Sequence, residues 1–419
     1  SVATFSACGG SSSSSSTKVP DYSSVYYVHN LVFKNGTTLS TGYNAFGQLG
    51  RGNLDNRSVP GPLSQYYPFK GFATGGDHSV AFTDTGEVYS WGYNAYGQLG
   101  NSSTTYSSVP FKTAFPPGVK SVAVAAGAFH SLSISDDGKV WTWGWNNYGQ
   151  LGYLTGSGYS ILPIPIVDLV SGGGIPKAVA IAANGYNSMA LTEKPNAANP
   201  LTDKVVWAWG SNLNGQLGYN PVDFNASPTP RIVPGLPDGI TGIASGSAFS
   251  YAVDVAGEVW AWGNNSNSQL GNGTVMADSN IPSSCATATI PSYIPVQVMT
   301  SLTDKLTGVI QVAAGYHHGL ALLSDGSVWA WGSNLLGQLG TGPNVVTGDS
   351  CFAVKVALPN DANGAPLKAK DIRAFGSSSM AQTESGAWYV WGYNLYGQLG
   401  TGADGTNSNA FTPVKMSGF

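Results

Sequence analysis

Short apolar segments alternate with polar residues and tight turns along most of the chain. In one representative stretch, the small apolar segment Val122–Gly127 is followed by Ser131–Ile134, a turn at Asp137-Gly138, and Val140–Trp143. Apolar and polar side chains alternate in these segments, which is typical of half-buried strands. Asp-Gly favours a hairpin turn because Gly adopts positive φ without steric cost. The pattern predicts short antiparallel strands, and no helical period of useful length competes with it.

This unit recurs seven times, and each copy closes with the same loop motif, Trp-Gly followed by Gly-Gln-Leu-Gly. The first copy has Thr41 where the others have Trp, and the fifth has Ser268 where the others have the first Gly of Gly-Gln-Leu-Gly. We expect the motif tryptophans to pack between adjacent sheets, and the motif Asn and Gln to satisfy loop backbone groups. The six tryptophans are Trp91, Trp143, Trp209, Trp262, Trp331 and Trp391.

Seven units of three or four strands predict an all-β, seven-bladed β-propeller over residues 21–419. A closed ring of blades protects the sheet edges from pairing with other chains. Residues 1–20 contain six consecutive Ser residues and are interpreted as a flexible tail, linker or assembly arm. The first repeat lacks its Trp and begins with an atypical strand around Val25 to Phe33, where the ring has to close.

The motifs Ala-Gly-x-x-His-Ser, Asp-Gly-x-Val-Trp-x-Trp-Gly and Gly-Gln-Leu-Gly resemble the regulator of chromosome condensation repeat family. The resemblance covers about residues 22 to 419 and implies a seven-bladed propeller. Its founding eukaryotic type exchanges nucleotide on a small GTPase and binds chromatin, whereas secreted bacterial relatives include a protein inhibitor of β-lactamase. We interpret this chain as a secreted bacterial-type member, although a fold of this kind does not decide function.

Histidines at a repeated position are the main candidates for chemistry. His78, His130 and His318 share one place in their repeats, where other repeats have Asn187, Phe249 and Ser379. A side chain that recurs in this way indicates a structural role, so we expect no catalytic residue, no metal site and no cofactor. No nucleophile elbow, phosphate loop or Cys–His pair occurs either. The sequence therefore predicts a protein that is not an enzyme.

Charge and hydropathy exclude two further classes of protein. The net charge is −4, only 10% of residues are charged, and no run of basic residues occurs. Nucleic-acid binding needs a basic surface to neutralise phosphates, so we expect no nucleic-acid partner. No apolar stretch is long enough to span a bilayer as a helix.

The three cysteines give information on the cellular compartment of the protein. Cys285 and Cys351 lie in long insertions of neighbouring repeats, and a disulfide between them would fit an oxidising compartment; two unrelated thiols are the alternative. Phe5-Ser6-Ala7-Cys8 followed by Gly and Ser resembles a bacterial lipoprotein cleavage box, so Cys8 is a candidate for a lipid anchor or for a contact with another subunit. We expect a secreted or cell-surface protein.

Four insertions follow Gly-Gln-Leu-Gly, at 153–175, 219–236, 272–306 and 341–368. Because equivalent loops of a repeat protein share a face, we expect them to crowd one side of the disc and to carry a binding surface. Exposed aromatic residues are the candidates, with packing of the loops as the alternative reading. They are Tyr153, Tyr159, Phe224, Tyr293 and Phe352.

Three function classes follow from these observations. A secreted binding or scaffold module is favoured, with a protein, a glycan or a second copy as partner; a protein inhibitor and an adhesin belong to this class. Strand addition by the tail would make the protein a filament subunit. Nucleotide exchange on a small GTPase rests on the resemblance alone, and an enzyme would need a carboxylate pair in the central channel.

Overall fold

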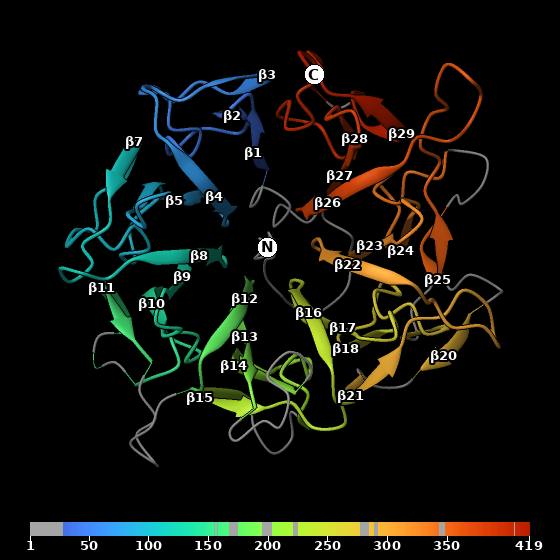
Figure 1. Ribbon diagram of the computed structural model, residues 1–419, viewed down its shortest axis with the longest axis horizontal. Helices are drawn as coiled ribbons and strands as arrows, with labels where there is room; N and C mark the ends of the chain where they lie inside the picture. Colours follow the sequence, from blue (N-terminus) through green and yellow to red (C-terminus); the bar gives the residue numbers. More distant parts are fainter. Residues whose placement is uncertain are drawn as a thin grey trace, which may run out of the picture.

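The computed structural model describes residues 28–154, 156, 158–166, 175–194, 203–220, 225–276, 285–288, 292–342, 348–405 and 407–419. The strands of these residues form seven antiparallel sheets around a central axis, and Figure 1 shows them as blades of a propeller. No helix long and apolar enough to cross a membrane occurs in this part of the chain. The predicted all-β, seven-bladed propeller is confirmed.

Blades 2 to 7 are four-stranded meanders whose first strand lies nearest the axis (Figure 1). In blade 1, β1, β2 and β3 match the second, third and fourth strands of the other blades. Blades 1 to 4 contain β1 (His29–Lys34), β2 (Thr37–Gly42), β3 (Arg57–Pro62); β4 (Phe69–Thr74), β5 (His78–Thr83), β6 (Val88–Gly92), β7 (Ser107–Lys112); β8 (Ser121–Ala126), β9 (His130–Ser135), β10 (Val140–Trp145), β11 (Tyr159–Pro165); β12 (Ala178–Asn184), β13 (Asn187–Glu193), β14 (Lys204–Ser211) and β15 (Ala226–Ile232). Blades 5 to 7 contain β16 (Ile240–Ser245), β17 (Phe249–Asp254), β18 (Val259–Gly263), β21 (Ser292–Gln297); β22 (Val309–Ala314), β23 (His318–Leu323), β24 (Val328–Gly332), β25 (Ser350–Lys355); β26 (Ala369–Phe375), β27 (Ser378–Thr383), β28 (Trp388–Gly392) and β29 (Ala410–Lys415). A short parallel pair, β19 (Thr274–Met276) and β20 (Ala286–Ala288), is added to blade 5.

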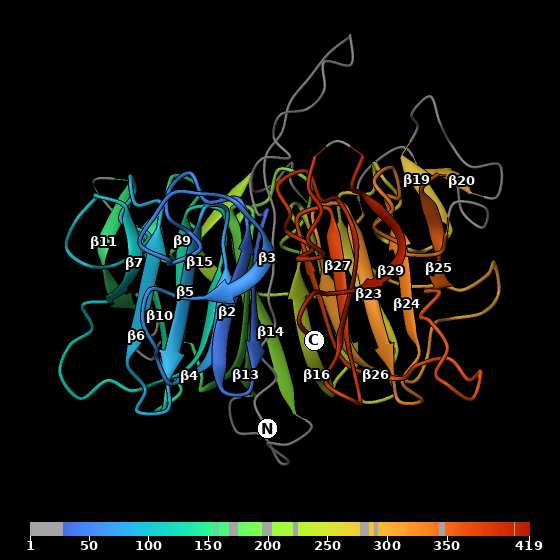
Figure 2. The same ribbon diagram turned by 90° about the horizontal axis from the view of Figure 1, so that it is seen from above.

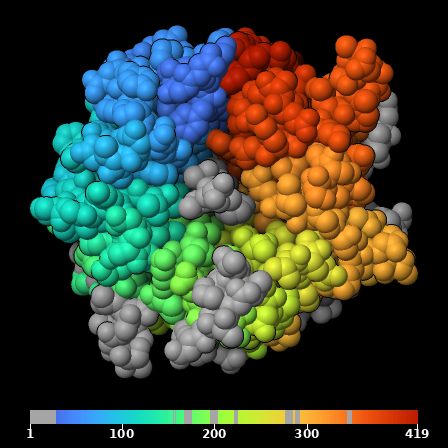
Figure 3. Space-filling view, viewed as in Figure 1, coloured from blue at the N-terminus to red at the C-terminus, as the bar shows by residue number. Residues whose placement is uncertain are grey.

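The ring closes where blade 1 meets blade 7. Thr41, which replaces the motif Trp, donates its hydroxyl hydrogen to the Gly397 carbonyl at 2.9 Å. The backbone N–H of Gly402 donates to the Ser58 carbonyl at 2.8 Å. Figure 3 shows the blue atoms of blade 1 directly against the red atoms of blade 7. At this junction the Thr41 hydroxyl therefore makes a hydrogen bond between the blades in place of a motif indole.

The motif tryptophans join the other blades. All six are fully buried, and each indole N–H donates to the carbonyl of the motif Gln in the preceding blade, as Trp143 does to Gln98 at 2.8 Å. Burying an indole contributes several kcal/mol of apolar transfer free energy, and the hydrogen bond fixes its orientation. The predicted packing of tryptophan between sheets is confirmed for Trp91, Trp143, Trp209, Trp262, Trp331 and Trp391.

The loop motif is held by its own Asn and Gln. In blade 3, the Leu151 N–H donates to the Asn146 side-chain oxygen at 2.9 Å, and the Tyr148 N–H donates to the Gln150 side-chain oxygen at 3.0 Å. The motif Gly144 has φ of +102°, and a Cβ there would lie 2.5 Å from the Phe129 carbonyl oxygen. The same bonds recur in the other motif copies, so this loop is a rigid platform.

Both ends of each blade can be assigned to a face. In a meander, the turn from first to second strand and the loop from third to fourth strand lie at the same end. This end carries the Gly-Gln-Leu-Gly loops and the β19–β20 pair, which is at the top of Figure 2. We call it the motif face. The opposite face carries the tight turns, where Gly36, Gly86, Gly138, Gly257, Gly326 and Gly386 all have positive φ, as the hairpin signals predict.

The expectation that the four insertions crowd one side is wrong. Each insertion contains the outer strand of its blade, β11, β15, β21 or β25, which runs from the motif face to the opposite face. The described residues before that strand lie at the motif face. The described residues after it, such as 299–306 in blade 5, lie at the opposite face.

Candidate functional site

Nine aromatic side chains gather on the motif face. Their contacts run from Phe46 in blade 1 to Tyr186 in blade 4, and a further pair, Tyr43 and Tyr396, joins blade 1 to blade 7 with ring centroids 4.9 Å apart. We call this set the aromatic arc. It comprises Tyr43, Phe46, Tyr93, Tyr96, Phe129, Trp145, Tyr148, Tyr186 and Tyr396.

Two positions of the loop motif and one position of the inner turn build the arc. Tyr93 and Trp145 follow the motif Gly, Tyr96 and Tyr148 lie three residues further on, and Phe129 precedes the second strand of blade 3. At the junction of blades 2 and 3, the Phe129 ring lies 5.9 Å from Tyr93 and 5.4 Å from Tyr96. Residues far apart in the sequence therefore meet because the propeller sets their blades side by side.

The arc side chains are partly exposed. Most of these rings pack edge-on or tilted against their neighbours, as Trp145 does against Tyr186 at 4.9 Å and 70°, and Tyr148 stacks on Tyr186 at 5.4 Å and 28°. Packed rings hold one another in place, so they lose little conformational entropy when a ligand covers them. Tyr and Trp are also the residues most often found at the energetic centres of protein interfaces. The arc has the composition of a preformed protein-binding surface.

Blades 4 to 6 break the pattern. The positions equivalent to Tyr93 and Trp145 hold Ser211, Asn264 and Ser333, and those equivalent to Tyr96 hold Asn214, Asn267 and Leu336. The motif face is thus aromatic over blades 7, 1, 2 and 3 and mainly polar over the remaining blades. For the arc residues in the loop motif, blades 4 to 6 therefore supply matched replacements from the chain itself.

One carboxylate interrupts the arc. Asp77 is at the inner-turn position that Phe129 occupies in blade 3, and it is only 3% exposed. The Gln48 side-chain amide donates to its Oδ1 at 3.1 Å, and the Tyr93 N–H donates to its backbone carbonyl at 2.8 Å. Burial raises the pKa of Asp77 to about 7.

The repeated histidines are structural. His130 is fully buried, and its Nε2 lies 2.8 Å from the Ser188 hydroxyl of the next blade, which donates its own hydrogen to the Gln150 carbonyl. The hydroxyl hydrogen is used, so His Nε2 is the donor of the pair. His78 and His318 make the same contact, with Ser131 and Ser379.

Two assignments at this position need correction. His29 is a fourth member, bonded to Ser79 at 2.9 Å, and the equivalent residue in blade 7 is Ser378, which pairs with Gly392, not Ser379. Burial lowers the pKa of His29, His78, His130 and His318 to about 3. Within the described residues, no three His, Cys, Asp or Glu side chains come together as a metal site would need.

The aromatic residues proposed from the insertions are partly exposed where the structure describes them, as the arc residues are. Tyr153 is half-buried and its hydroxyl donates to the Thr142 carbonyl at 3.4 Å; burial raises its pKa to about 12. Tyr159, Tyr293 and Phe352 are also half-buried, the last two beside glycines of the preceding blade, Gly215 and Gly273. Phe224 lies outside the described residues.

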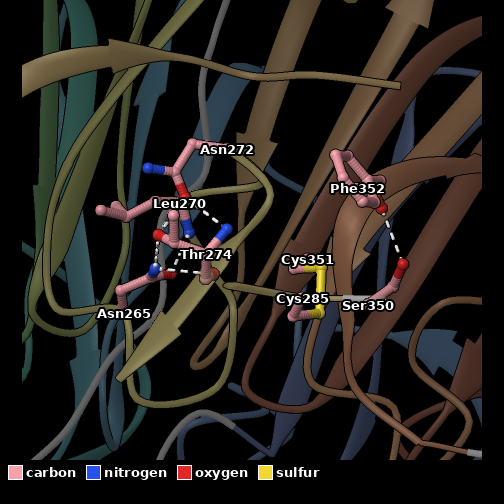
Figure 4. Close-up of a disulfide and its surroundings, with 8 residues drawn as sticks. All are labelled: Asn265, Leu270, Asn272, Thr274, Cys285, Ser350, Cys351 and Phe352. Carbon is pink, nitrogen blue, oxygen red and sulfur yellow. Dashed lines mark hydrogen bonds between the residues drawn. A yellow bond between two sulfur atoms is a disulfide. The ribbon is translucent and has the colours of Figure 1, made fainter. Parts of the chain in front are cut away.

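The structure joins Cys285 and Cys351 by a disulfide, with their Cα atoms 6.0 Å apart (Figure 4). Cys285 precedes β20 and Cys351 lies in β25, so the bond connects the long loop of blade 5 to the outer strand of blade 6. The Gly273 N–H donates to the Cys351 carbonyl at 2.8 Å in support. Cys8 lies outside the described residues.

The arc was missed from the sequence although a signal was present. Aligning the seven loop motifs puts aromatic residues in two columns. One column holds Tyr43, Tyr93, Trp145 and Tyr393, and the other holds Phe46, Tyr96, Tyr148 and Tyr396. Aromatic residues in the insertions drew attention because insertions are where loops usually vary.

Comparison with known proteins matches the chain to a repeat profile described as the Regulator of chromosome condensation (RCC1) repeat. The matched residues are 35–82, 85–134, 137–191, 203–253, 256–322, 325–374 and 385–419. The Ultraviolet-B receptor UVR8 of Arabidopsis thaliana is 30% identical over 364 residues, which are 85% of this chain and 72% of that protein. The E3 ubiquitin-protein ligase HERC2 of Homo sapiens is 31% identical over 316 residues, which are 74% of this chain and only 6% of that protein.

Solved structures share the fold. Prp20p from Saccharomyces cerevisiae, described with its binding to Gsp1p and histones, superimposes with a TM-score of 0.72 at 23% identity, covering 94% of this chain and 88% of that one. Human WBSCR16 gives a TM-score of 0.72 at 22% identity, covering 92% of this chain and 94% of that one. These relatives are eukaryotic.

Proposed function

Because the chain belongs to the regulator of chromosome condensation repeat family, we propose that it is a non-enzymatic binding propeller that holds a protein partner on the aromatic arc. The observation that carries this proposal is the unbroken run of partly exposed rings from Phe46 to Tyr186 on one face. Prp20p, which shares the fold, is described with its binding to Gsp1p and histones, and this supports the assignment to protein-binding propellers.

The test replaces arc residues by those the chain itself uses elsewhere. Tyr96→Asn and Trp145→Ser introduce the residues of blade 4, Asn214 and Ser211, so the loop motif is expected to keep its fold. Protein captured from the native source by the wild-type chain should be lost with this double variant. Capture that is equal for both chains would refute a role for the arc.

A secreted or cell-surface location is the second part of the proposal. Its support is the Cys285–Cys351 disulfide, since disulfides persist in oxidising compartments. Alkylation of native material before and after reduction tests it, and thiols that react without reduction would count against it. A lipid anchor at Cys8 would appear as acylation of that residue by mass spectrometry.

Self-assembly through the N-terminal tail is a second candidate function. Its support is the sequence of residues 1–20, in which Cys8 and six consecutive Ser residues precede the propeller.

In this candidate function the N-terminal tail of one copy would add a strand to a second copy. Electron microscopy of the full chain beside a chain that lacks residues 1–20 tests this. Filaments that disappear on truncation support a filament subunit, and single discs in both samples exclude it. If the chain is a nucleotide exchange factor, the alternative implied by the family, its addition should speed nucleotide release from a small GTPase. A protein inhibitor or an adhesin would bind its target through the same arc.

A further inference from the structure

The junction of blades 1 and 2 differs from the two junctions that follow it. At those junctions the inner-turn position holds an aromatic ring, Phe129 or Tyr186, which fills the space between the neighbouring motif loops. At the first junction the same position holds Asp77. A carboxyl group therefore lies where the next two junctions have an aromatic ring.

Aromatic rings surround this position. Phe46 and Tyr93 belong to the motif loops on either side, and their ring centroids are 4.8 Å apart. Gln48 links them to the carboxylate, since its side-chain oxygen accepts the Phe46 N–H at 2.9 Å and its amide donates to Asp77 at 3.1 Å. The Asp77 carboxylate is thus tied through Gln48 to the loop that carries Phe46, and the Asp77 backbone carbonyl accepts the Tyr93 N–H at 2.8 Å.

The charge of Asp77 has no cation of its own. The described part of the chain contains no ion pair of Asp77, and burial is the cause of its raised pKa. At the next two junctions the side-chain amides of Gln98 and Gln150 have no hydrogen-bond partner within the described residues. Neighbouring blades therefore pack together at those junctions without a carboxylate that accepts from the motif Gln. A propeller of this repeat therefore does not need an acid at this position.

We propose that this junction of the aromatic arc receives a cationic side chain of the protein partner, an arginine in particular. The guanidinium would stack on the Phe46 and Tyr93 rings, while the Asp77 carboxylate that Gln48 holds supplies the opposite charge. The partly desolvated setting strengthens both attractions relative to water. This inference rests on the proposed function, and it names the chemistry that the partner presents at one point of the arc.

The test uses the full chain and two small probes, N-acetyl-arginine methylamide and its neutral isostere N-acetyl-citrulline methylamide. The chain carries 3-fluorotyrosine, with the Tyr93 signal assigned from the Tyr93→Phe variant, and binding is followed by ¹⁹F NMR. The arginine probe should shift the Tyr93 signal and the citrulline probe should not. Asp77→Asn keeps the oxygen that accepts from Gln48 but removes the charge, and it should weaken arginine binding by about tenfold or more.

Asp136→Asn is the matched control, because Asp136 is an exposed acid in a turn of the opposite face, and it should bind the probe as the wild type does. Tyr93→Asn introduces the residue of blade 5, Asn264, and should also weaken binding, now followed by the shift of the probe's own resonances. Equal binding of arginine and citrulline, or of wild type and Asp77→Asn, would overturn the inference. If the arc variants still abolish protein capture in that case, the cation site fails while the proposed function stands.

Discussion

Acid should unfold this protein through its four buried histidines. Each of His29, His78, His130 and His318 has a folded pKa of about 3, well below the value of about 6.5 expected in the unfolded chain. Between these values the unfolded state binds more protons, so stability is fully present above pH 6.5 and decreases as the pH falls towards 3. At pH 5.5 each histidine costs about 1.4 kcal/mol, and the four together about 6 kcal/mol.

Asp77 acts in the opposite direction. Its folded pKa of about 7 lies above the unfolded value, so its contribution is present at low pH and is lost as the pH rises through 7. At pH 5.5 protonation of Asp77 stabilises the folded state by about 2 kcal/mol. The free energy of unfolding is therefore about 4 kcal/mol lower at pH 5.5 than at pH 7.5. Such a loss is a large share of the 5–15 kcal/mol that stabilises a typical protein.

Urea unfolding at pH 7.5 and 5.5 measures this difference. His130→Asn introduces the residue that blade 4 has at this place, Asn187, whose amide donates to Ser245 at 2.9 Å. The variant should reduce the difference between the two pH values by about 1.4 kcal/mol, and Asp77→Asn should increase it by about 2 kcal/mol. A pH difference that is the same in all three chains would refute the assignment of acid sensitivity to these groups.

Three further changes test the packing of the blades. Trp143→Phe leaves the buried Gln98 carbonyl without the indole N–H and should cost about 1–3 kcal/mol by urea unfolding; no loss would show that this bond is dispensable. Gly127→Ala places a Cβ 2.1 Å from His130 Cε1 and should lower Tm by several degrees, whereas Gly118→Ala on a surface turn with open space around it should cost less. The double variant Cys285→Ser, Cys351→Ser opens a 66-residue loop and should cost up to about 4 kcal/mol, so equal Tm values with and without reductant in the wild type would contradict the role of the bond.

Much of the architecture could be predicted because the repeat encodes it locally. Turn glycines such as Gly138, the buried Trp143 and the loop Asn146 each have one structural role that follows from residue type. Repetition of the same roles seven times left few alternatives to a propeller.

The outer strands were harder to recognise. β15 contains Pro228 and Pro230, which remove backbone donors and are typical of loops, yet an outer edge strand tolerates them because its far side needs no partner. Since these strands were taken as parts of insertions, the insertions were assigned to one face. The structure divides them between both faces.

The candidate site could not be predicted for a different reason. Phe129 and Tyr96 are 33 positions apart in the sequence, and their contact depends on how one blade is placed against the next. Alternation within a strand carries no information on that placement. The same holds for Asp77, because its contact with Gln48 of the preceding blade cannot be read from the sequence of its own turn.

The central claim is that the aromatic arc is the binding surface, and site-specific photo-crosslinking tests it most directly. Benzoylphenylalanine would replace Tyr96 in one chain and the exposed Asp136 of the opposite face in another, each mixed with native extract and irradiated. The account predicts a discrete crosslinked protein from position 96 and none from position 136. The same product from both positions, or one from position 136 alone, would contradict it.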